Sequence, residues 1–310
     1  MYPNLTPTLT ALLGLALAVA AFIALRRPVL RRLALRQVNR RRGEAALVVA
    51  GSVLGTAIII GSLIVGDTLD FSVKQTAYHN LGPIDEYVSA QTVAQGDEAA
   101  RRIERLRGDP DIDGILSLRG DRAAVTRSAG GTRKAEPRAS VWEVDFAKAA
   151  AFGGGAGGSG LSGPAPGRGE AVINQDLADA IDAHPGETLT VYLYGKAREV
   201  RVARIVPTSG LAGAGVGDVS RNLFFGPGVL VEAARSSGAK AEPRAFTFVS
   251  NTGDTEGGNR RSDAVEQKLK AALGPLTSQG VAVDKTKQSV LDAARQVGDS
   301  LGSLFLFIGS

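Results

Sequence analysis

Two uncharged apolar stretches, one on each side of an arginine run, constrain this chain more than any other feature. Neither Leu5–Leu25 nor Ala45–Gly66 carries a charged side chain. A helix of about 20 mostly apolar residues crosses the ~30 Å hydrocarbon core of a bilayer, where the backbone must satisfy its own hydrogen bonds. We therefore expect transmembrane helices in residues 1–26 and 45–66. The alternative is a pair of buried core helices.

The arginine run predicts how the chain is oriented in the membrane. Arg26–Arg42 holds eight arginines and no acidic residue. Loops rich in Lys and Arg stay in the cytoplasm, so we expect the N-terminus and everything from Asp67 onward on the extracytoplasmic side. A cleaved signal peptide carries its positive charge before its apolar region. Here the arginines follow the apolar region, so no cleavage is expected.

The distribution of charge argues against nucleic-acid binding. The formal net charge is +5, but from Asp67 to the end the chain has 28 Lys and Arg against 30 Asp and Glu. A nucleic-acid-binding domain spreads basic residues over a folded face to neutralise several phosphates. The excess basicity of this chain lies in one short segment, so we expect no nucleic-acid partner.

Residues 27–44 predict an amphipathic helix that lies in the inner interface of the bilayer. Leu30, Leu33, Ala34 and Val38 fall on one helical face, and most of the arginines fall elsewhere. The alternative is an irregular solvated loop. In the second expected span, Gly51 and Gly55 lie four residues apart, a spacing that favours close packing against another helix in lipid.

The end of the chain predicts a stalk helix that enters a third span, residues 287–310. Val290, Leu291, Ala294 and Val297 form one apolar stripe, and Leu301–Ser310 is uncharged over about half the length of a span. A third transmembrane helix would make this chain part of a longer membrane protein. The alternative is a buried C-terminal helix of the preceding domain.

Between the second and third spans we expect an α+β ectodomain. Strand, helix and strand patterns follow one another twice: 85–90, 96–108 and two strands around Gly120-Asp121, then 245–250, 261–274 and 280–285. Two βαβ-type units that bracket a segment predict one subdomain, formed by residues 67–151 and 236–286. A further strand is expected at 138–146. A Gly-rich linker, 152–169, leads to an inserted mainly β subdomain, 170–235. In it we expect strands at 170–173, 188–194 and 199–205 and a helix at 175–181.

No pattern predicts catalysis, a cofactor or a metal. The chain has no cysteine, and its two histidines, His79 and His184, have no spaced partner ligands. The glycine-rich stretches lack the Gly-Lys-Ser/Thr ending of a phosphate loop. Asp109, Asp111 and Asp113 alternate as in a calcium loop but lack its bidentate Glu, so a solvated turn is expected. We expect that the chain is not an enzyme.

Three segments resemble the FtsX-like/MacB-like ABC transporter permeases. Leu33–Leu69 is similar to the start of these proteins, where an interfacial helix leads into a membrane helix. "GEAVINQDLADAIDAHPGETLTVYLYGKAREVRVARIVPTSG" is similar to their ectodomain signature of a Glu-x-Val-Ile strand, a Leu-Ala helix, a Pro-Gly-Glu-Thr-Leu turn and a strand pair ending in Ile-Val. Gln288–Ser310 matches the position of the stalk helix before their next span.

The resemblance implies a non-enzymatic, multi-pass permease of the cytoplasmic membrane with a large extracytoplasmic domain. In this family a cytoplasmic ATP-binding subunit drives motion of the ectodomain, and a second permease copy or homologue completes the assembly in the lipid bilayer. The resemblance places the interfacial helix near the ATPase, at Leu33, Leu35, Arg36, Asn39 and Arg40. The helix Leu5–Leu25 is not part of the family plan.

Two other functions stay open at this point. One is a membrane-anchored extracytoplasmic sensor or adhesion module that has no ATPase. The other is a membrane-tethered hydrolase, which the scarcity of histidine disfavours.

Overall fold

The computed structural model describes Ala18, Phe22 and Arg26, and residues 41–153, 159–215, 220–238, 240–253, 255–290 and 292. Apart from Ala18, Phe22 and Arg26, the expected first span lies outside these residues, as do nearly all of the basic segment and the expected third span. The chain divides into two compact units, Met1–Gly66 with Ser300–Ser310, and Asp67–Asp299. We call the second of these the large unit.

The expected second span lies in α3 (Arg42–Leu81), a helix of 40 residues. α3 contains the range 45–66 and continues past Gly66 to Leu81. The side chains of residues 59, 62–67 and 69–81 are not described. In the part of the chain that is described, no helix combines the length and the apolar character needed to cross a bilayer. Insertion of residues 45–66 into a membrane stays a prediction.

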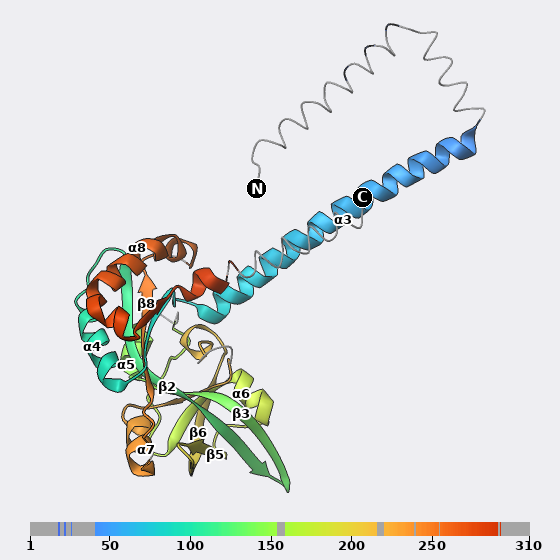
Figure 1. Cartoon of the computed structure of the whole chain (residues 1–310). Coiled ribbons are helices and arrows are strands. Elements are labelled where there is room, and N and C mark those ends of the chain that lie inside the picture. The colour runs from blue at the N-terminus through green and yellow to red at the C-terminus, as the bar shows by residue number, and fades with distance from the viewer. Residues whose placement is uncertain are drawn as a thin grey trace. The chain divides into compact units, whose positions relative to one another are not determined.

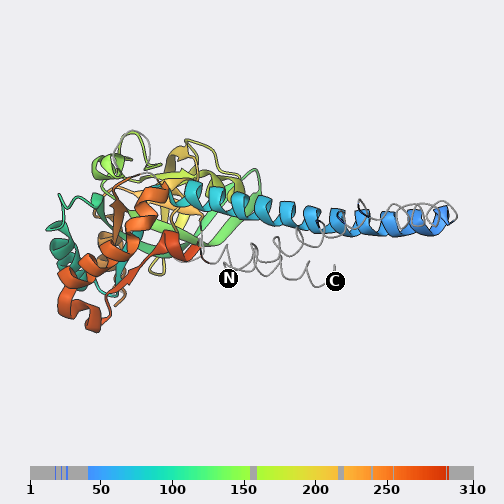
Figure 2. The same ribbon diagram turned by 90° about the horizontal axis from the view of Figure 1, so that it is seen from above.

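One half of the large unit is a four-stranded antiparallel sheet with two helices on one face (Figure 1 and Figure 2). Its elements are β1 (Glu86–Ala90), α4 (Val93–Glu104), β2 (Ile112–Ala129), β8 (Arg244–Asn251), α8 (Thr255–Leu273) and β9 (Ala282–Asp284). The strands lie in the order β9-β1-β8-β2. This is the split βαβ arrangement of ferredoxin-like folds. The expected α+β fold is thus confirmed for this part of the chain.

The other half is a closed ring of six strands. It consists of the second part of β2 with β3 (Thr132–Glu143), β4 (Glu170–Asn174), β5 (Thr188–Leu193), β6 (Lys196–Val206) and β7 (Asn222–Phe225). The strands pair in the cycle β2-β3-β7-β4-β6-β5-β2. The β3–β7 and β4–β6 pairs are parallel and the other four are antiparallel. Closure leaves the ring with no open sheet edge where these pairs form.

The short helices complete the two halves. They are α5 (Phe146–Ala151), α6 (Gln175–Ile181) and α7 (Val229–Ser237), with the 3₁₀ turns η1 (Gly210–Ala212) and η2 (Gly274–Gln279). α6 lies in the expected range 175–181, directly after β4. α6 and α7 contribute apolar side chains to the core of the ring.

The interior of the ring follows from the alternation of side chains along each strand. Successive residues of a strand point to opposite faces. The buried residues of the ring strands are accordingly spaced two apart: Ala123 and Val125, Ala139 and Val141, Ala171 and Ile173, Leu189, Val191 and Leu193, Val200 and Val202, and Leu223 and Phe225. The ring therefore encloses a filled apolar core.

The expected break at Gly120-Asp121 is wrong, because β2 runs through it as one strand of 18 residues. Gly120 pairs directly opposite Trp142 on β3. A Cβ placed on Gly120 would lie 2.5 Å from Cζ3 of Trp142. The glycine therefore makes room for a cross-strand aromatic ring and does not form a turn. Because β2 is uninterrupted, it can pair with β8 at one end and with β3 and β5 at the other.

Other element boundaries also differ from expectation. α4 begins earlier than residue 96, because the side chain of Thr92 caps it by accepting a hydrogen bond from the backbone N–H of Gln95. β3 ends before Phe146, because Asp145 caps α5 instead of continuing the strand. β3 lies in the range 67–151, which was expected to belong to the α+β subdomain. It pairs instead with β7, which lies in the expected inserted β subdomain, 170–235.

Candidate functional site

The most unusual contact of the large unit is an ion pair with both partners buried. Lys287 Nζ lies 2.7 Å from Asp85 Oδ1, and the two side chains are 1% and 2% exposed. Asp85 immediately precedes β1, and Lys287 lies in the helical residues 286–290 that follow β9. The backbone N–H of Lys287 also donates to the carbonyl of Asp85. We call this contact the joint.

The remaining oxygen of Asp85 is also held. Asp85 Oδ2 accepts a hydrogen bond of 2.8 Å from the backbone N–H of Asn251 at the end of β8. Gly258 of α8 makes room for this carboxylate, since a Cβ there would lie 2.9 Å from Oδ2. Burial raises the pKa of Asp85, while the Lys287 ammonium favours the ionised form. We expect the pair to stay ionised, because the ammonium lies within hydrogen-bonding distance.

The joint connects residues from near the two ends of the large unit. The chain passes between the two compact units only at Gly66–Asp67 and at Asp299–Ser300. Asp85 directly precedes β1, the first strand of the large unit, and Lys287 belongs to the last described helical segment of that unit, residues 286–290. The ion pair therefore joins segments that lie 202 residues apart in the sequence.

A second buried acid, Glu86, lies beside the joint. Its side chain is fully buried, and Oε1 accepts a hydrogen bond of 2.9 Å from Nδ2 of Asn251. Burial raises the pKa of Glu86 to about 7, with smaller opposing effects from the side chains of Ser262 and Asn251. Two buried carboxylates thus share the single ammonium of Lys287.

Arg119 of β2 links the two halves of the large unit. Its Nη2 lies 3.0 Å from Asp97 Oδ1 on α4, and its Nη1 lies 3.3 Å from Glu143 Oε1 at the end of β3. The other oxygen of Glu143 accepts the backbone N–H of Leu230 in the first turn of α7 at 2.8 Å. A groove of about 700 Å³ adjoins these residues. Arg119 therefore couples α4 to the ring and to α7.

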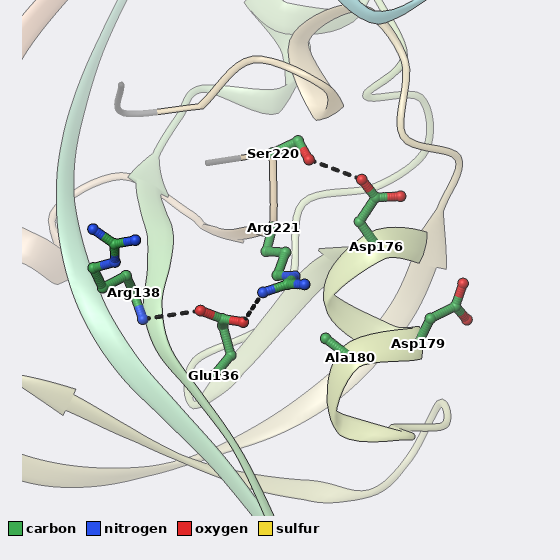
Figure 3. A pocket seen from close by; sticks show the side chains of 7 residues that line it. All are labelled: Glu136, Arg138, Asp176, Asp179, Ala180, Ser220 and Arg221. Carbon is green, nitrogen blue, oxygen red and sulfur yellow. Dashed lines mark hydrogen bonds and ion pairs between the residues drawn. The ribbon is translucent and has the colours of Figure 1, made fainter. Parts of the chain in front are cut away.

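A polar pocket of about 670 Å³ lies on the ring between β3 and α6 (Figure 3). Ser220 Oγ donates to Asp176 Oδ2 at 2.8 Å, and Arg221 forms an ion pair with Glu136. The guanidinium of Arg138 points away from Glu136 in Figure 3, although its backbone N–H donates to that carboxylate. Among the described residues that line the pocket, no imidazole lies beside this hydroxyl–carboxylate pair.

The carboxylates that alternate before β2 form ion pairs. Lys268 Nζ lies 2.6 Å from Asp109 Oδ1 and 2.8 Å from Asp111 Oδ2. Arg261 also binds Asp111, at 3.2 Å. These partners, which lie on α8, replace the solvent expected around this turn. Among the described residues, no group of three or more His, Cys, Asp or Glu side chains could hold a metal ion.

The other residues singled out from the sequence lie apart from the joint. The expected ATPase-facing residues Leu33, Leu35, Arg36, Asn39 and Arg40 lie outside the described residues. Gly51 and Gly55 lie in α3, and a Cβ built on either would meet no atom within 4 Å. Their packing against another helix stays a prediction. The His184 side chain is exposed, and that of His79 is not described.

Sequence reasoning missed the joint. Asp85 and Glu86 stand at the start of an expected strand, and Lys287 stands in an expected helix. Charged residues in such positions are ordinarily solvated. Two adjacent acids ahead of a strand were the only available signal, and they do not reveal a partner 202 residues away.

No family model and no curated protein matches the sequence. Among solved structures, the chain is similar to the extracellular domain of the noncanonic ABC-type transporter YknZ from Gram-positive bacteria, at 10% identity and a TM-score of 0.35 over 64% of this chain and 97% of that one. It is also similar to a domain assigned to a permease protein of Porphyromonas gingivalis, at 10% identity and a TM-score of 0.34 over 63% and 86%. Similarity at this level does not establish a shared function.

Proposed function

We propose that the chain is a non-enzymatic permease subunit of an ABC-type export or mechanotransmission system of the cytoplasmic membrane. In this proposal a cytoplasmic ATP-binding subunit drives motion of the large unit, which lies on the extracytoplasmic side. A second permease copy or homologue completes the assembly. The observation that carries the proposal is the joint, because it binds the strand after one connection to the helix before the other.

The joint suits the transmission of force. A buried ion pair is a poor source of net stability, since desolvation of two charges offsets most of their attraction. It does fix the position of Asp85 relative to Lys287, because separating the pair would leave two unpaired buried charges, which is energetically unfavourable. Displacement of the segment that holds Lys287 would therefore carry Asp85, and with it β1, which directly follows Asp85, and β8, to which Asp85 is hydrogen bonded.

A path leads from the joint to the ring. β8 pairs with the first part of β2, and the second part of β2 belongs to the ring. Arg119, near the middle of β2, binds acids on α4 and β3. The two halves are therefore connected both by a continuous strand and by an ion-pair network, as a domain that moves as a whole requires.

Co-purification tests whether an ATPase binds the chain. The tagged full-length protein, extracted from native membranes in mild detergent, is expected to bring down an ATP-binding subunit. Charge reversal in the expected interfacial helix, Arg36→Glu with Arg40→Glu, is expected to abolish this. The matched control is Arg201→Glu, because the Arg201 side chain on β6 is 62% exposed and lies in the large unit.

The outcomes separate the proposal from its alternative. If no ATP-binding subunit accompanies the wild-type chain, the permease proposal is wrong. A membrane-anchored binding module would then be favoured by the polar pocket between β3 and α6. If Arg201→Glu abolishes binding as the interfacial variant does, the ATPase does not contact the interfacial helix selectively.

A further inference from the structure

Glu86 and Asn251 form half of an acid–amide pair. Asn251 Nδ2 donates to Glu86 Oε1 at 2.9 Å. Glu86 Oε2 and Asn251 Oδ1 are both buried, and neither has a hydrogen-bond partner in the structure. The side chains of Glu86 and Asn251 are 0% and 2% exposed. Two buried oxygen acceptors without a donor are an unfavourable arrangement, since each forfeits its hydrogen bond to water.

A proton on Glu86 would supply the missing donor. A neutral carboxyl has one O–H donor and one carbonyl acceptor, and a primary amide has complementary groups. The amide already donates to Oε1, and a proton on Oε2 would give Glu86 a hydroxyl donor, the kind of group that the buried acceptor Asn251 Oδ1 lacks. We propose that Glu86 is a proton-binding site of the large unit, occupied when the surrounding solution becomes mildly acidic. The proton closes the pair with Asn251 and so tightens the joint.

The charges around Glu86 favour uptake of a proton. Asp85 on the same segment repels a second negative charge, and Asp113 at the start of β2 adds to the negative potential at Asp85. Lys287 is the opposing cation, and its ammonium is bonded to Asp85. The cluster of Asp85, Glu86 and Lys287 therefore holds one negative charge in excess when Glu86 is ionised.

The other elements packed against Glu86 add no further free charge among the described residues. β8 presents the amide of Asn251, and α8 presents the hydroxyl of Ser262. The neighbours of Ser262 on α8 are already paired, Arg261 with Asp111 and Asp263 with Lys285. On β9, Asp284 raises the pKa of the neighbouring Tyr87.

The sign of the pH dependence follows from where Glu86 binds its proton. Burial raises the pKa of Glu86 from 4.5 to about 7 in the folded chain. Between these values the folded state holds a proton that the unfolded state has released, so the free energy of unfolding falls as the pH rises. Linkage predicts that the folding equilibrium constant decreases on the order of 100-fold between pH 5 and pH 8.

Unfolding of the full chain in detergent tests this dependence. Trp142 is the sole tryptophan and is 1% exposed, so its fluorescence reports unfolding of the large unit. Wild type is expected to unfold at lower denaturant at pH 8 than at pH 5. Glu86→Gln, a neutral side chain that can keep both hydrogen bonds, is expected to lose this difference. The control Glu199→Gln, at an exposed position on β6, should keep it.

A titration of the unmodified protein supports the same test without a variant. In ¹³C NMR of protein with labelled glutamate, one carboxyl is expected to titrate near pH 7, far above the ordinary glutamate pKa. The inference is overturned if every glutamate titrates below pH 5.5, or if Glu86→Gln retains the wild-type pH dependence of unfolding. Neither result depends on an ATPase, so these measurements test the proton site independently of the proposed function.

Discussion

Gly120 lies directly opposite Trp142 in the β2–β3 ladder, and the indole occupies the space where a side chain would be. Trp142 also packs against Phe246 and Phe248, with ring centroids 5.2 and 5.8 Å away in edge-on geometry. These aromatic rings fill the core between the two halves of the large unit. A single missing Cβ on β2 thus determines how closely the halves pack.

The substitution Gly120→Ala is expected to destabilise the large unit by about 2 kcal/mol, because overpacking of a filled core costs about 1–3 kcal/mol. Urea unfolding followed by Trp142 fluorescence measures the loss. Gly226→Ala is the control, since the nearest atom to its Cβ would be a carbonyl oxygen at 3.8 Å. Equal midpoints for the two variants would contradict the role assigned to Gly120.

In the joint, removal of one charge and replacement of both charges are expected to have very different effects on stability. Loss of one partner of a buried ion pair leaves the other charge uncompensated and typically costs about 3–5 kcal/mol, whereas replacement of both by neutral groups can be nearly neutral. Variants that probe transmission through the joint must therefore change Asp85 and Lys287 together. Only then does a change in function report on coupling and not on unfolding.

At the scale of elements, α6 and β7 are held together by one buried amide. Asn174 caps α6 through its Oδ1, which accepts from the backbone N–H of Leu177 at 3.1 Å. The same oxygen accepts from the backbone N–H of Asn222 on β7 at 2.9 Å. Its Nδ2 donates to the carbonyl of Ala212 in η1 at 2.9 Å. One side chain thereby supplies hydrogen-bond partners to backbone groups of three elements, α6, β7 and η1.

Asn174→Ala is expected to cost about 3 kcal/mol, because it leaves two buried N–H groups without an acceptor and each such group costs about 1–3 kcal/mol. Thr92→Ala removes the exposed cap of α4 and is expected to cost only about 1 kcal/mol. Thermal unfolding of the two variants side by side measures the difference. A smaller loss for Asn174→Ala than for Thr92→Ala would refute the network.

Local patterns were sufficient to predict most elements of the large unit. β4, α6, β5 and β6 lie within two or three residues of the expected ranges, because their alternation, caps and turns act between neighbours in the chain. β2 was predicted as two strands, because a glycine followed by an aspartate ordinarily marks a turn. Only the position of Trp142 on the adjacent strand explains why the strand continues there.

Closure of the ring and the joint could not be predicted from local pattern. The β3–β7 pair joins residues about 80 positions apart, and the ion pair of the joint spans a still longer stretch of chain. Nothing in the period of a strand specifies which distant strand it will pair with. The buried amides and ions can therefore be recognised as a site only once it is known which distant strands lie side by side.

At the scale of the whole molecule, the large unit is connected to the rest of the chain by two covalent links, and the joint binds the residue before its first strand to its last described helical segment. In the proposed permease, work done by the ATPase on the membrane helices enters the ectodomain at this point. A protonated Glu86 would make the same point stiffer. Transmission is then expected to be more efficient in a mildly acidic exterior than in an alkaline one.

In the proposed permease, ATP hydrolysis moves the large unit, and the ion pair between Asp85 and Lys287 transmits this motion. The chain has no cysteine, so spin labels can be attached at two introduced cysteines, one in place of Leu47 on α3, which is 76% exposed and lies outside the large unit, and one in place of exposed Arg101 on α4. Pulsed electron paramagnetic resonance then measures the distance between the labels in membranes that contain the ATPase subunit. The joint variant is Asp85→Asn with Lys287→Met, and its folding is checked by Trp142 fluorescence.

The matched control is Asp263→Asn with Lys285→Met, an ion pair of the same 2.7 Å length whose aspartate is 73% exposed. An ATP-dependent change of distance is expected in the wild type and in this control, and no change is expected in the joint variant. An equal ATP-dependent change in the joint variant, or no change in the wild type, would contradict transmission through the joint.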